Sequence, residues 1–116
     1  GGYAVMLYAN AQTPQEQAAA FQSSLLFPLL STPWKLYLLA LIGAQTLRFG
    51  QIRQALPDVS RASVTKYLTE LERDGFLYRT VYPAPPLRTD YSLSPLGLGV
   101  LPLVRKLIAW SDDPTQ

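Results

Sequence analysis

Basic side chains are the groups in this chain whose type and spacing could do chemistry, and they gather in its middle. The first Lys or Arg is Lys35, and the segment from Arg48 to Arg88 holds seven basic residues against four acidic ones. Arginine and lysine neutralise phosphates and release the counterions that a nucleic acid carries. The formal net charge is only +2. The local concentration of basic residues, rather than the total charge, therefore indicates double-stranded DNA as a partner.

The chain has no His and no Cys, which removes most of the chemistry that an active site needs. Disulfides, thiol redox sensing, zinc sites of the usual ligands and histidine acid–base catalysis are all excluded. Glu70 and Glu72 fall on different faces of one predicted helix, and no nucleophile has a base to activate it. We therefore expect no enzyme, no catalytic residue, no metal site and no cofactor.

Length and composition predict a folded chain of one domain. Of its 116 residues, 48% are apolar and 16% are charged, and a chain this apolar often covers surface against a partner. The apolar runs at residues 3–9 and 36–42 are too short to cross a membrane, and residues 1–10 lack the basic start of a signal peptide. We expect a cytoplasmic protein with no membrane segment. Residues 1–11 are left open between a short helix and a strand.

Apolar helices are predicted near both ends of the chain. The Thr-Pro pair at residues 13–14 is a typical helix start, and this helix should run to about residue 30, with Pro28 kinking or ending it. The Ser-Pro pair at residues 94–95 opens a last helix that should reach about residue 110 and bend at Pro102. Helices this poor in charge are unlikely to lie bare on the surface of a monomer.

The middle of the chain predicts a helix-turn-helix followed by a hairpin. The expected elements are a helix over 34–44, an extended piece over 46–49, helices over 49–56 and 61–74, and strands over 76–82 and 87–93. In the first of these helices, Trp34, Leu38, Leu41 and Ile42 are expected to point to the core. The stiff proline-rich segment 83–86 joins the two strands.

The helix over 61–74 is expected to have one side in the core and the other in solvent. Ser60 is a good N-cap for it, and its solvent side carries no acid before Glu70. Its core-facing residues are expected to be Val64, Leu68 and Leu71. A helix of this kind fits the major groove of DNA, where the residues of its first turns reach base edges.

The ordered motifs from Trp34 to Trp110, about two thirds of the chain, resemble the HxlR family of winged-helix regulators. They include Leu47-Arg48-Phe49, the stretch LERDGFLYRTVYP, and the pair Pro85-Pro86 with the stretch YSLSPLG that begins five residues after it. The long stretch alone is common among winged helices, whereas the ordered set is much more specific. The resemblance implies a mainly α-helical fold with a small β-hairpin, a winged helix-turn-helix with N- and C-terminal dimerisation helices.

The resemblance also implies a transcriptional regulator that binds DNA sequence-specifically as a homodimer. It divides the chain into an N-terminal extension and dimerisation helix (1–30), a DNA-binding core (31–93) and a C-terminal dimerisation helix and tail (94–116). The recognition helix, about 60–74, would lie in the major groove, and the wing, about 76–93, on the backbone or minor groove. Two half-sites would lie roughly 34 Å apart. The residues expected to contact DNA are Arg48, Arg53, Arg61, Ala62, Ser63, Thr65, Lys66, Arg79 and Arg88. Those expected in the dimer interface are Phe21, Leu25, Leu29, Leu103, Leu107 and Trp110.

Three positions depart from the family pattern. Many members carry a sensing cysteine in the helix before the tryptophan, where this chain has Phe21 and its neighbours. Ala62 stands where the recognition helix often has a basic residue, so a base preference does not carry over. Leu98 stands where a basic residue commonly follows the glycine of the last helix, so that phosphate contact of the family does not carry over to this chain.

Several expectations have alternatives. Arg48 and Arg53 either contact phosphate or pair with Asp58, and the two hairpin arginines either contact DNA or pair with Asp90; we favour DNA for at least one of the hairpin pair. A winged helix that assembles proteins without binding DNA is the alternative function, favoured by the small net charge. If the protein has an effector, a hydrophobic small molecule in the dimer crevice is the expected class.

Overall fold

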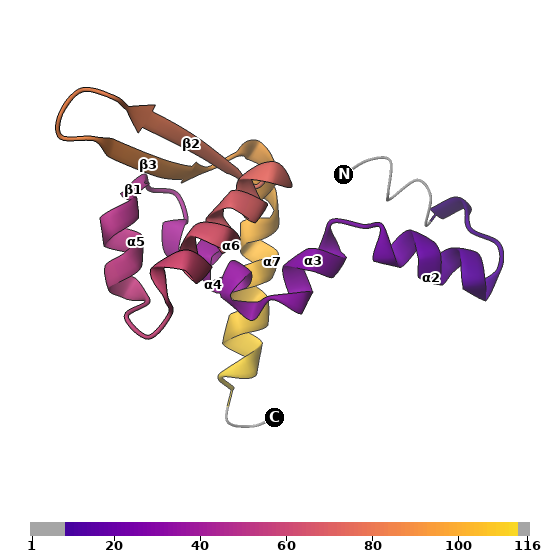
Figure 1. The fold of residues 1–116 in the computed structure, drawn as a ribbon. Coiled ribbons are helices and arrows are strands. Elements are labelled where there is room, and N and C mark those ends of the chain that lie inside the picture. The colour runs from indigo at the N-terminus through magenta and orange to yellow at the C-terminus, as the bar shows by residue number, and fades with distance from the viewer. Residues whose placement is uncertain (1–8, 114–116) are drawn as a thin grey trace. The chain divides into compact units, whose positions relative to one another are not determined.

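The computed structural model describes residues 9–113, so the expectation for residues 1–11 lies almost entirely outside the described part. The chain forms two compact units, Gly1–Pro33 and Trp34–Gln116. The elements, labelled as in Figure 1, are α2 (Pro14–Gln22), α3 (Leu26–Ser31), α4 (Pro33–Ile42), β1 (Leu47–Arg48), α5 (Phe49–Ala55), α6 (Arg61–Arg73), β2 (Leu77–Tyr82), β3 (Arg88–Leu93) and α7 (Pro95–Ser111). This order is the winged-helix order that the sequence predicts. None of the described helices is long and apolar enough to cross a membrane.

Between residues 13 and 31 the structure has two helices, α2 and α3, where the sequence predicts one. Thr13 caps α2 as expected, because its side chain accepts from the backbone N–H of Glu16 at 3.1 Å. The helix then ends at Gln22, where Ser24 Oγ donates to Phe21 O at 2.6 Å and competes with the helical pattern. Pro28, which the sequence predicts to kink or end the helix, does not cause the break between α2 and α3. It lies in the first turn of α3, where a missing N–H costs nothing.

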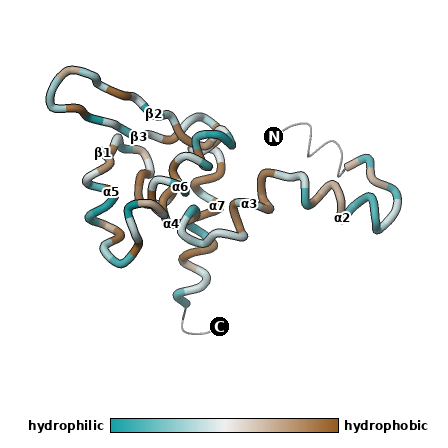
Figure 2. The backbone as a smooth tube through the Cα atoms, in the orientation of Figure 1, coloured by the Kyte–Doolittle hydropathy of each residue, from teal (hydrophilic) through white to brown (hydrophobic). Residues whose placement is uncertain are grey.

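The core of the second unit is made by α4, α5, α6 and α7, and Figure 2 shows apolar residues along α4 and α7. The fully buried side chains are Leu38, Leu39, Ile42, Ile52, Leu56, Val64, Leu68, Leu71 and Val104. The predicted inward stripe of the recognition helix is thus confirmed. Gly43 and Gly75 follow α4 and α6 with positive φ angles of 55° and 89°, the left-handed conformation that closes a helix.

The predicted inward position of Trp34 is wrong. Trp34 is 41% exposed and packs edge-on against Tyr37, with ring centroids 5.7 Å apart. Lys35 is buried instead, at 2% exposure, and shares one helical face with Leu38 and Ile42. The spacing i, i+3, i+7 puts these three side chains on the core side of α4. The predicted inward positions of Leu38 and Ile42 are therefore confirmed, Leu41 is half-buried, and the buried face is turned from Trp34 toward Lys35.

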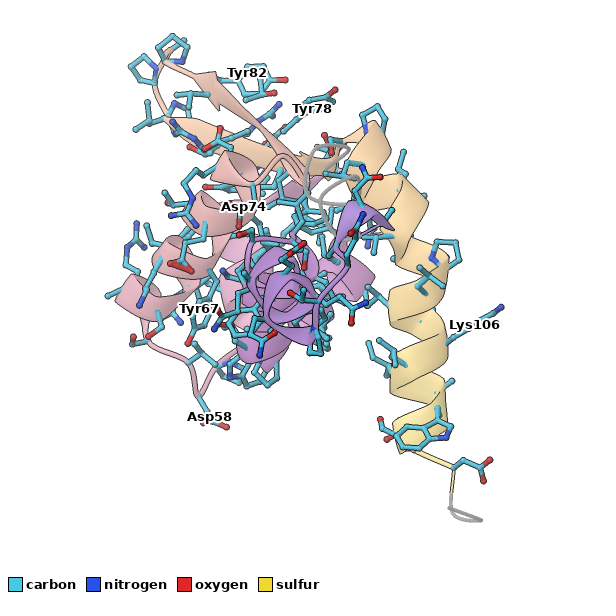
Figure 3. The ribbon with its side chains drawn as sticks, turned by 90° about the vertical axis from the view of Figure 1, so that its right-hand side faces the viewer. Asp58, Tyr67, Asp74, Tyr78, Tyr82 and Lys106 are labelled. Carbon is cyan, nitrogen blue, oxygen red and sulfur yellow. The ribbon has the colours of Figure 1, made fainter. Side chains whose placement is uncertain are left out.

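The hairpin belongs to a small antiparallel sheet of order β1-β3-β2. β2 pairs with β3 from Leu77 opposite Leu93 to Tyr82 opposite Arg88, and Leu47 of β1 pairs with Tyr91. The extended piece predicted before α5 is therefore the third strand. β2 lies at the outer edge, and all of its residues except Leu77 are exposed. Figure 3 shows Tyr78 and Tyr82 on this outer strand, at the opposite end of the unit from Asp58.

The start of α7 is fixed tightly to the base of the hairpin. Ser94 caps the helix by accepting from the N–H of Gly97 at 3.2 Å, and it donates to the carbonyl of Gly75. Gly97 is required here, because a Cβ at this position would lie 2.3 Å from the carbonyl oxygen of Phe76. Pro102 lies inside α7. The helix buries Leu101 and Val104 and leaves the predicted apolar side exposed.

Candidate nucleic-acid interface

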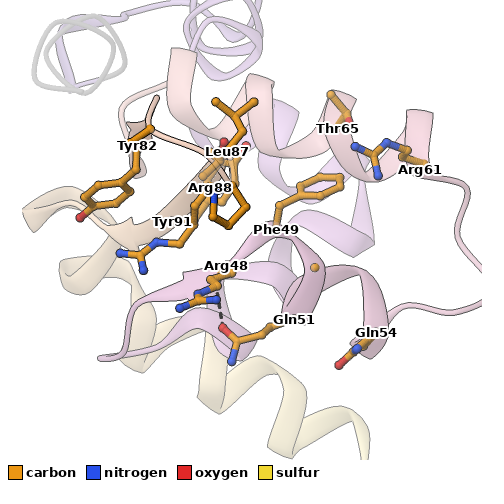
Figure 4. A pocket seen from close by; sticks show the side chains of 14 residues that line it. Arg48, Phe49, Gln51, Gln54, Arg61, Thr65, Tyr82, Leu87, Arg88 and Tyr91 are labelled. Carbon is orange, nitrogen blue, oxygen red and sulfur yellow. Dashed lines mark hydrogen bonds between the residues drawn. The ribbon is translucent and has the colours of Figure 1, made fainter.

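An open groove of about 940 Å³ lies between the hairpin, α5 and the first turns of α6. Figure 4 shows its side chains. Its lining residues are Arg48, Phe49, Gly50, Gln51 and Gln54 from β1 and α5, Arg61 and Thr65 from α6, and Tyr82, Ala84, Pro86, Leu87, Arg88, Thr89 and Tyr91 from the hairpin region. Three of these residues are arginines and none carries a carboxylate. The groove is therefore a cationic surface suited to an anionic chain.

The first turns of α6 form one wall of this groove. Ser60 caps the helix as predicted, since its Oγ accepts from the N–H of Ser63 at 3.1 Å. Ser63 is half-buried and its hydroxyl lies 3.0 Å from that of Ser60. The other expected DNA contacts on this helix, Arg61, Ala62, Thr65 and Lys66, are all exposed. The polar side of α6 therefore faces solvent within this chain, as a duplex-binding helix requires.

Arg61 lies over an aromatic ring. Its guanidinium carbon is 4.8 Å from the centroid of the Phe49 ring. Phe49 is the first residue of α5 and is half-buried, so the ring joins the two helices of the helix-turn-helix. No carboxylate of residues 9–113 forms an ion pair with Arg61. A cation stacked on a ring in this way is attracted to the ring face.

The two hairpin arginines are both paired with acids. Arg88 Nε lies 3.2 Å from Asp90 Oδ1, one of the pairings that the sequence allows, although the two atoms do not meet with hydrogen-bond geometry. Its guanidinium also stacks on Tyr82 at 4.3 Å. Arg79 Nε lies 3.4 Å from Glu72 Oε1. The positive charge of the hairpin is thus partly neutralised before any ligand arrives.

The two arginines before and within α5 behave differently from each other. Arg53 does not pair with Asp58; its Nη1 donates to the backbone carbonyl of Val59 and fastens the turn before α6. Arg48 is exposed and lines the groove, and its backbone N–H donates to Gln51 Oε1 at 2.8 Å. Arg48 is therefore the better placed of the two to meet a phosphate.

A partly buried ion pair that the sequence pattern did not predict joins α6 to α4. Lys35 Nζ is 2.8 Å from Glu70 Oε1, and the side chains are 3% and 23% exposed. The hydrogen bond from Lys35 lowers the pKa of the Glu70 carboxyl, against the opposing effect of burial. The pair ties α6 to α4. The spacing of Lys35 with Leu38 and Ile42 was the signal that could have revealed it.

The residues expected to form a dimer interface are mostly on the surface. On α7, Leu103 is 60% and Trp110 is 66% exposed, and Leu107 lies between them on the same side. In the first unit Phe21 is exposed, Leu25 is half-buried and Leu29 is buried. The exposed side of α7 is a continuous apolar surface of the kind that another chain covers.

Residues 29–116 match the model of the HxlR-like helix-turn-helix family. The chain is 31% identical over 83 residues to the uncharacterised HTH-type transcriptional regulator YdzF of Bacillus subtilis, covering 71% of this chain and 76% of YdzF. It is 36% identical over 81 residues to the uncharacterised HTH-type transcriptional regulator YtfH of Escherichia coli, covering 70% of this chain but only 64% of YtfH. The solved structure of the redox regulator HypR in its reduced form matches with a TM-score of 0.68 and 31% identity, over 74% of this chain and 87% of HypR.

Proposed function

Because the chain belongs to the HxlR-like helix-turn-helix family of transcriptional regulators, we propose that it binds DNA sequence-specifically as a homodimer. The recognition helix α6 enters the major groove, and the hairpin β2–β3 lies on the backbone or in the minor groove. The observation that carries this proposal is the groove in which β1, α6 and the hairpin present three arginines and no lining residue carries a carboxylate. Such a surface favours a polyanion.

The unpaired cations supply most of the affinity in this proposal. Arg48 and Lys66 are exposed beside the groove and on α6, and no ion pair joins either of them to a carboxylate of residues 9–113. We infer that they neutralise phosphates. Arg79 and Arg88 contribute less because Glu72 and Asp90 already balance their charge.

Homodimer formation is supported by the apolar side of α7. Leu103, Leu107 and Trp110 are exposed together on this helix, whereas a helix in water normally turns charged residues outward. Two copies joined there present two recognition helices to successive major grooves, with half-sites roughly 34 Å apart. A hydrophobic effector in the dimer crevice stays a prediction from the sequence.

Selection of bound sequences from a random DNA pool, with purified protein, tests the proposal. We expect a pseudo-palindromic consensus with half-sites one helical turn apart. Affinity for this consensus should fall steeply with salt, by about 0.9 in the log–log slope for each phosphate neutralised. A pool that shows no enrichment, or binding that is indifferent to salt and to Lys66→Ala, would reject the proposal.

One observation favours a second function, the assembly of proteins without DNA. The hairpin exposes Tyr78 and, most of all, Leu87, which is 73% exposed, while both of its arginines are paired. A hairpin of this kind suits a protein surface as well as a duplex. Absence of DNA binding even at low salt, together with a stable complex that depends on Leu87, would favour this second function.

A further inference from the structure

We propose that Phe49 is a positioning residue for DNA recognition, because it holds the guanidinium of Arg61 so that its N–H edge meets a guanine. The inference rests on the proposed function and adds to it how Arg61, a side chain that reads a base, is held in position. Phe49 itself need not touch the duplex.

The geometry places the two side chains together at the joint of the helix-turn-helix. Phe49 is the first residue of α5 and Arg61 the first residue of α6, and both line the same groove (Figure 4). The guanidinium carbon lies 4.8 Å from the ring centroid, within the range of a cation–π contact. Because Phe49 is half-buried, its ring is a fixed platform rather than a second mobile group.

The ring is needed because the local electrostatics do not hold Arg61 in place. The positive end of a helix dipole disfavours a cation in the first turn, and the first turn of α6 contains no acid. No carboxylate of the described residues pairs with Arg61. An arginine in this setting would sample many rotamers, and fixing it on arrival of DNA would reduce affinity.

The contact with the ring holds the guanidinium without occupying its hydrogen-bond donors. An aromatic ring attracts a cation through its π-electrons, and the side chain of Arg61 has no hydrogen bond or ion pair to the described residues, so its N–H donors stay available. Arg88 differs in this respect: it also stacks, on Tyr82 at 4.3 Å, but it is paired with Asp90 as well. Arg61 is therefore the stacked arginine whose charge and donors both remain for a ligand.

The position of Arg61 favours a base edge over a phosphate. The first residues of a recognition helix reach into the major groove, and arginine binds the O6 and N7 atoms of guanine through two parallel hydrogen bonds. We therefore expect one guanine in each half-site of the selected consensus to depend on Arg61, and indirectly on Phe49.

A double-mutant cycle on the selected consensus tests the inference, with dissociation constants measured for Phe49→Leu, Arg61→Ala and the double variant. A cation–π contact contributes about 2- to 5-fold per half-site, so Phe49→Leu should weaken binding by a dimer about 4- to 25-fold. In the Arg61→Ala background the same change should alter affinity less than about twofold. Phe49→Tyr keeps the ring and should bind like the wild type. If Phe49→Leu folds poorly by circular dichroism, Phe49→Tyr carries the test: a folded Phe49→Tyr protein that loses affinity as Arg61→Ala does would contradict the inference.

The preference for one base over another distinguishes a positioning role from a merely structural one, because a loss of folding alone would not change it. Phe49→Leu should lower the preference for guanine at one position of each half-site and leave the preferences elsewhere intact. Equal losses for Phe49→Leu with and without Arg61, or weaker binding with every base preference intact, would overturn the inference while DNA binding stands. If the wild type itself binds no DNA, the proposed function fails and the inference fails with it.

Discussion

At the scale of single residues, Lys35 shows how a charged side chain can belong to the core. It is buried on the inner side of α4, where its ammonium meets the carboxylate of Glu70 on α6 at 2.8 Å. A buried ion pair contributes little compared with an apolar pair, but leaving one partner alone is costly. The pair therefore constrains which face α6 can turn toward α4, and so which face it turns to solvent.

Replacing Lys35 by Met should destabilise the protein by about 1–3 kcal/mol, because it leaves the partly buried Glu70 carboxylate without its partner. Urea denaturation followed by circular dichroism measures the change. Lys106→Met makes the same substitution at an exposed residue of α7 (Figure 3) and should stay within about 0.5 kcal/mol of the wild type. Equal stabilities for the two variants would show that the ion pair does not hold α6.

The lowered pKa of Glu70 also predicts a dependence of stability on pH. A carboxyl whose pKa is lower in the folded state stabilises the protein above the unfolded-state pKa, about 4.3 for Glu. This contribution is lost as the pH falls from there through the lower pKa of the folded state. Glu70→Gln should therefore lose less stability than the wild type between pH 6 and pH 3 in the same denaturation experiment. Parallel acid profiles of the two proteins would contradict this expectation.

At the scale of elements, the sequence predicts the helix-turn-helix and the hairpin to within one or two residues, because strong local signals mark their ends. Ser60 and Gly75 bracket α6, and Ser94 opens α7. The prediction fails for α2 and α3, where two serines interrupt the helix through hydrogen bonds to the backbone. Competition of this kind depends on side-chain rotamers that hydrophobic periodicity does not encode.

The junction of α7 with the hairpin gives a prediction about an element. Gly97→Ala should destabilise the protein by about 1–3 kcal/mol, since the new methyl group would meet the Phe76 carbonyl, which is backbone and cannot move aside. Gly99→Ala, two residues further along the helix, adds a methyl group into open space. It should raise stability by about 0.5–1 kcal/mol through helix propensity. Thermal unfolding of the two variants measures both changes. A lower stability of both variants would show that the effect comes from the helix as a whole rather than from its junction with the hairpin.

The unequal pairing of the basic residues predicts unequal salt effects. Lys66→Ala should reduce the magnitude of the log–log salt slope of DNA binding by about 1.8, which is 0.9 for each of two copies. Arg79→Ala should reduce it by less, because Glu72 already balances that charge. Titrations on the selected DNA at several salt concentrations measure both slopes. A larger change for Arg79→Ala than for Lys66→Ala would show that the hairpin pairs open on binding.

At the scale of the whole molecule, many of the apolar side chains that the composition indicates are not buried within one chain. The prediction of which residues form the core succeeds for α6 and for Leu38 and Ile42 of α4, and it fails for Trp34. A sequence pattern assigns a large aromatic residue such as Trp34 to the core because it is apolar. The orientation of α4 is instead decided by the packing of Leu38, Leu39 and Ile42 together. The groove could not be predicted either, because its walls come from segments that only the folded sheet brings together.

Homodimer formation predicts that a charge on the exposed side of α7 separates the subunits. Leu107→Glu should give a monomer in sedimentation equilibrium, and its affinity for the two-half-site DNA should fall by at least about tenfold as avidity is lost. Ala109 is also exposed but lies about 200° further around the helix. Ala109→Glu should therefore remain dimeric. A dimeric Leu107→Glu protein would place the interface elsewhere.

The outer position of β2 has one more consequence, for how the protein behaves at high concentration. An unpaired strand edge is a template on which other chains can add strands and build insoluble fibres. Here that edge is only six residues long, carries Arg79 within it, and leads into a tip rich in proline. A short edge with an arginine within it and prolines at its end disfavours further pairing, so we expect the hairpin to stand in solvent without seeding precipitation.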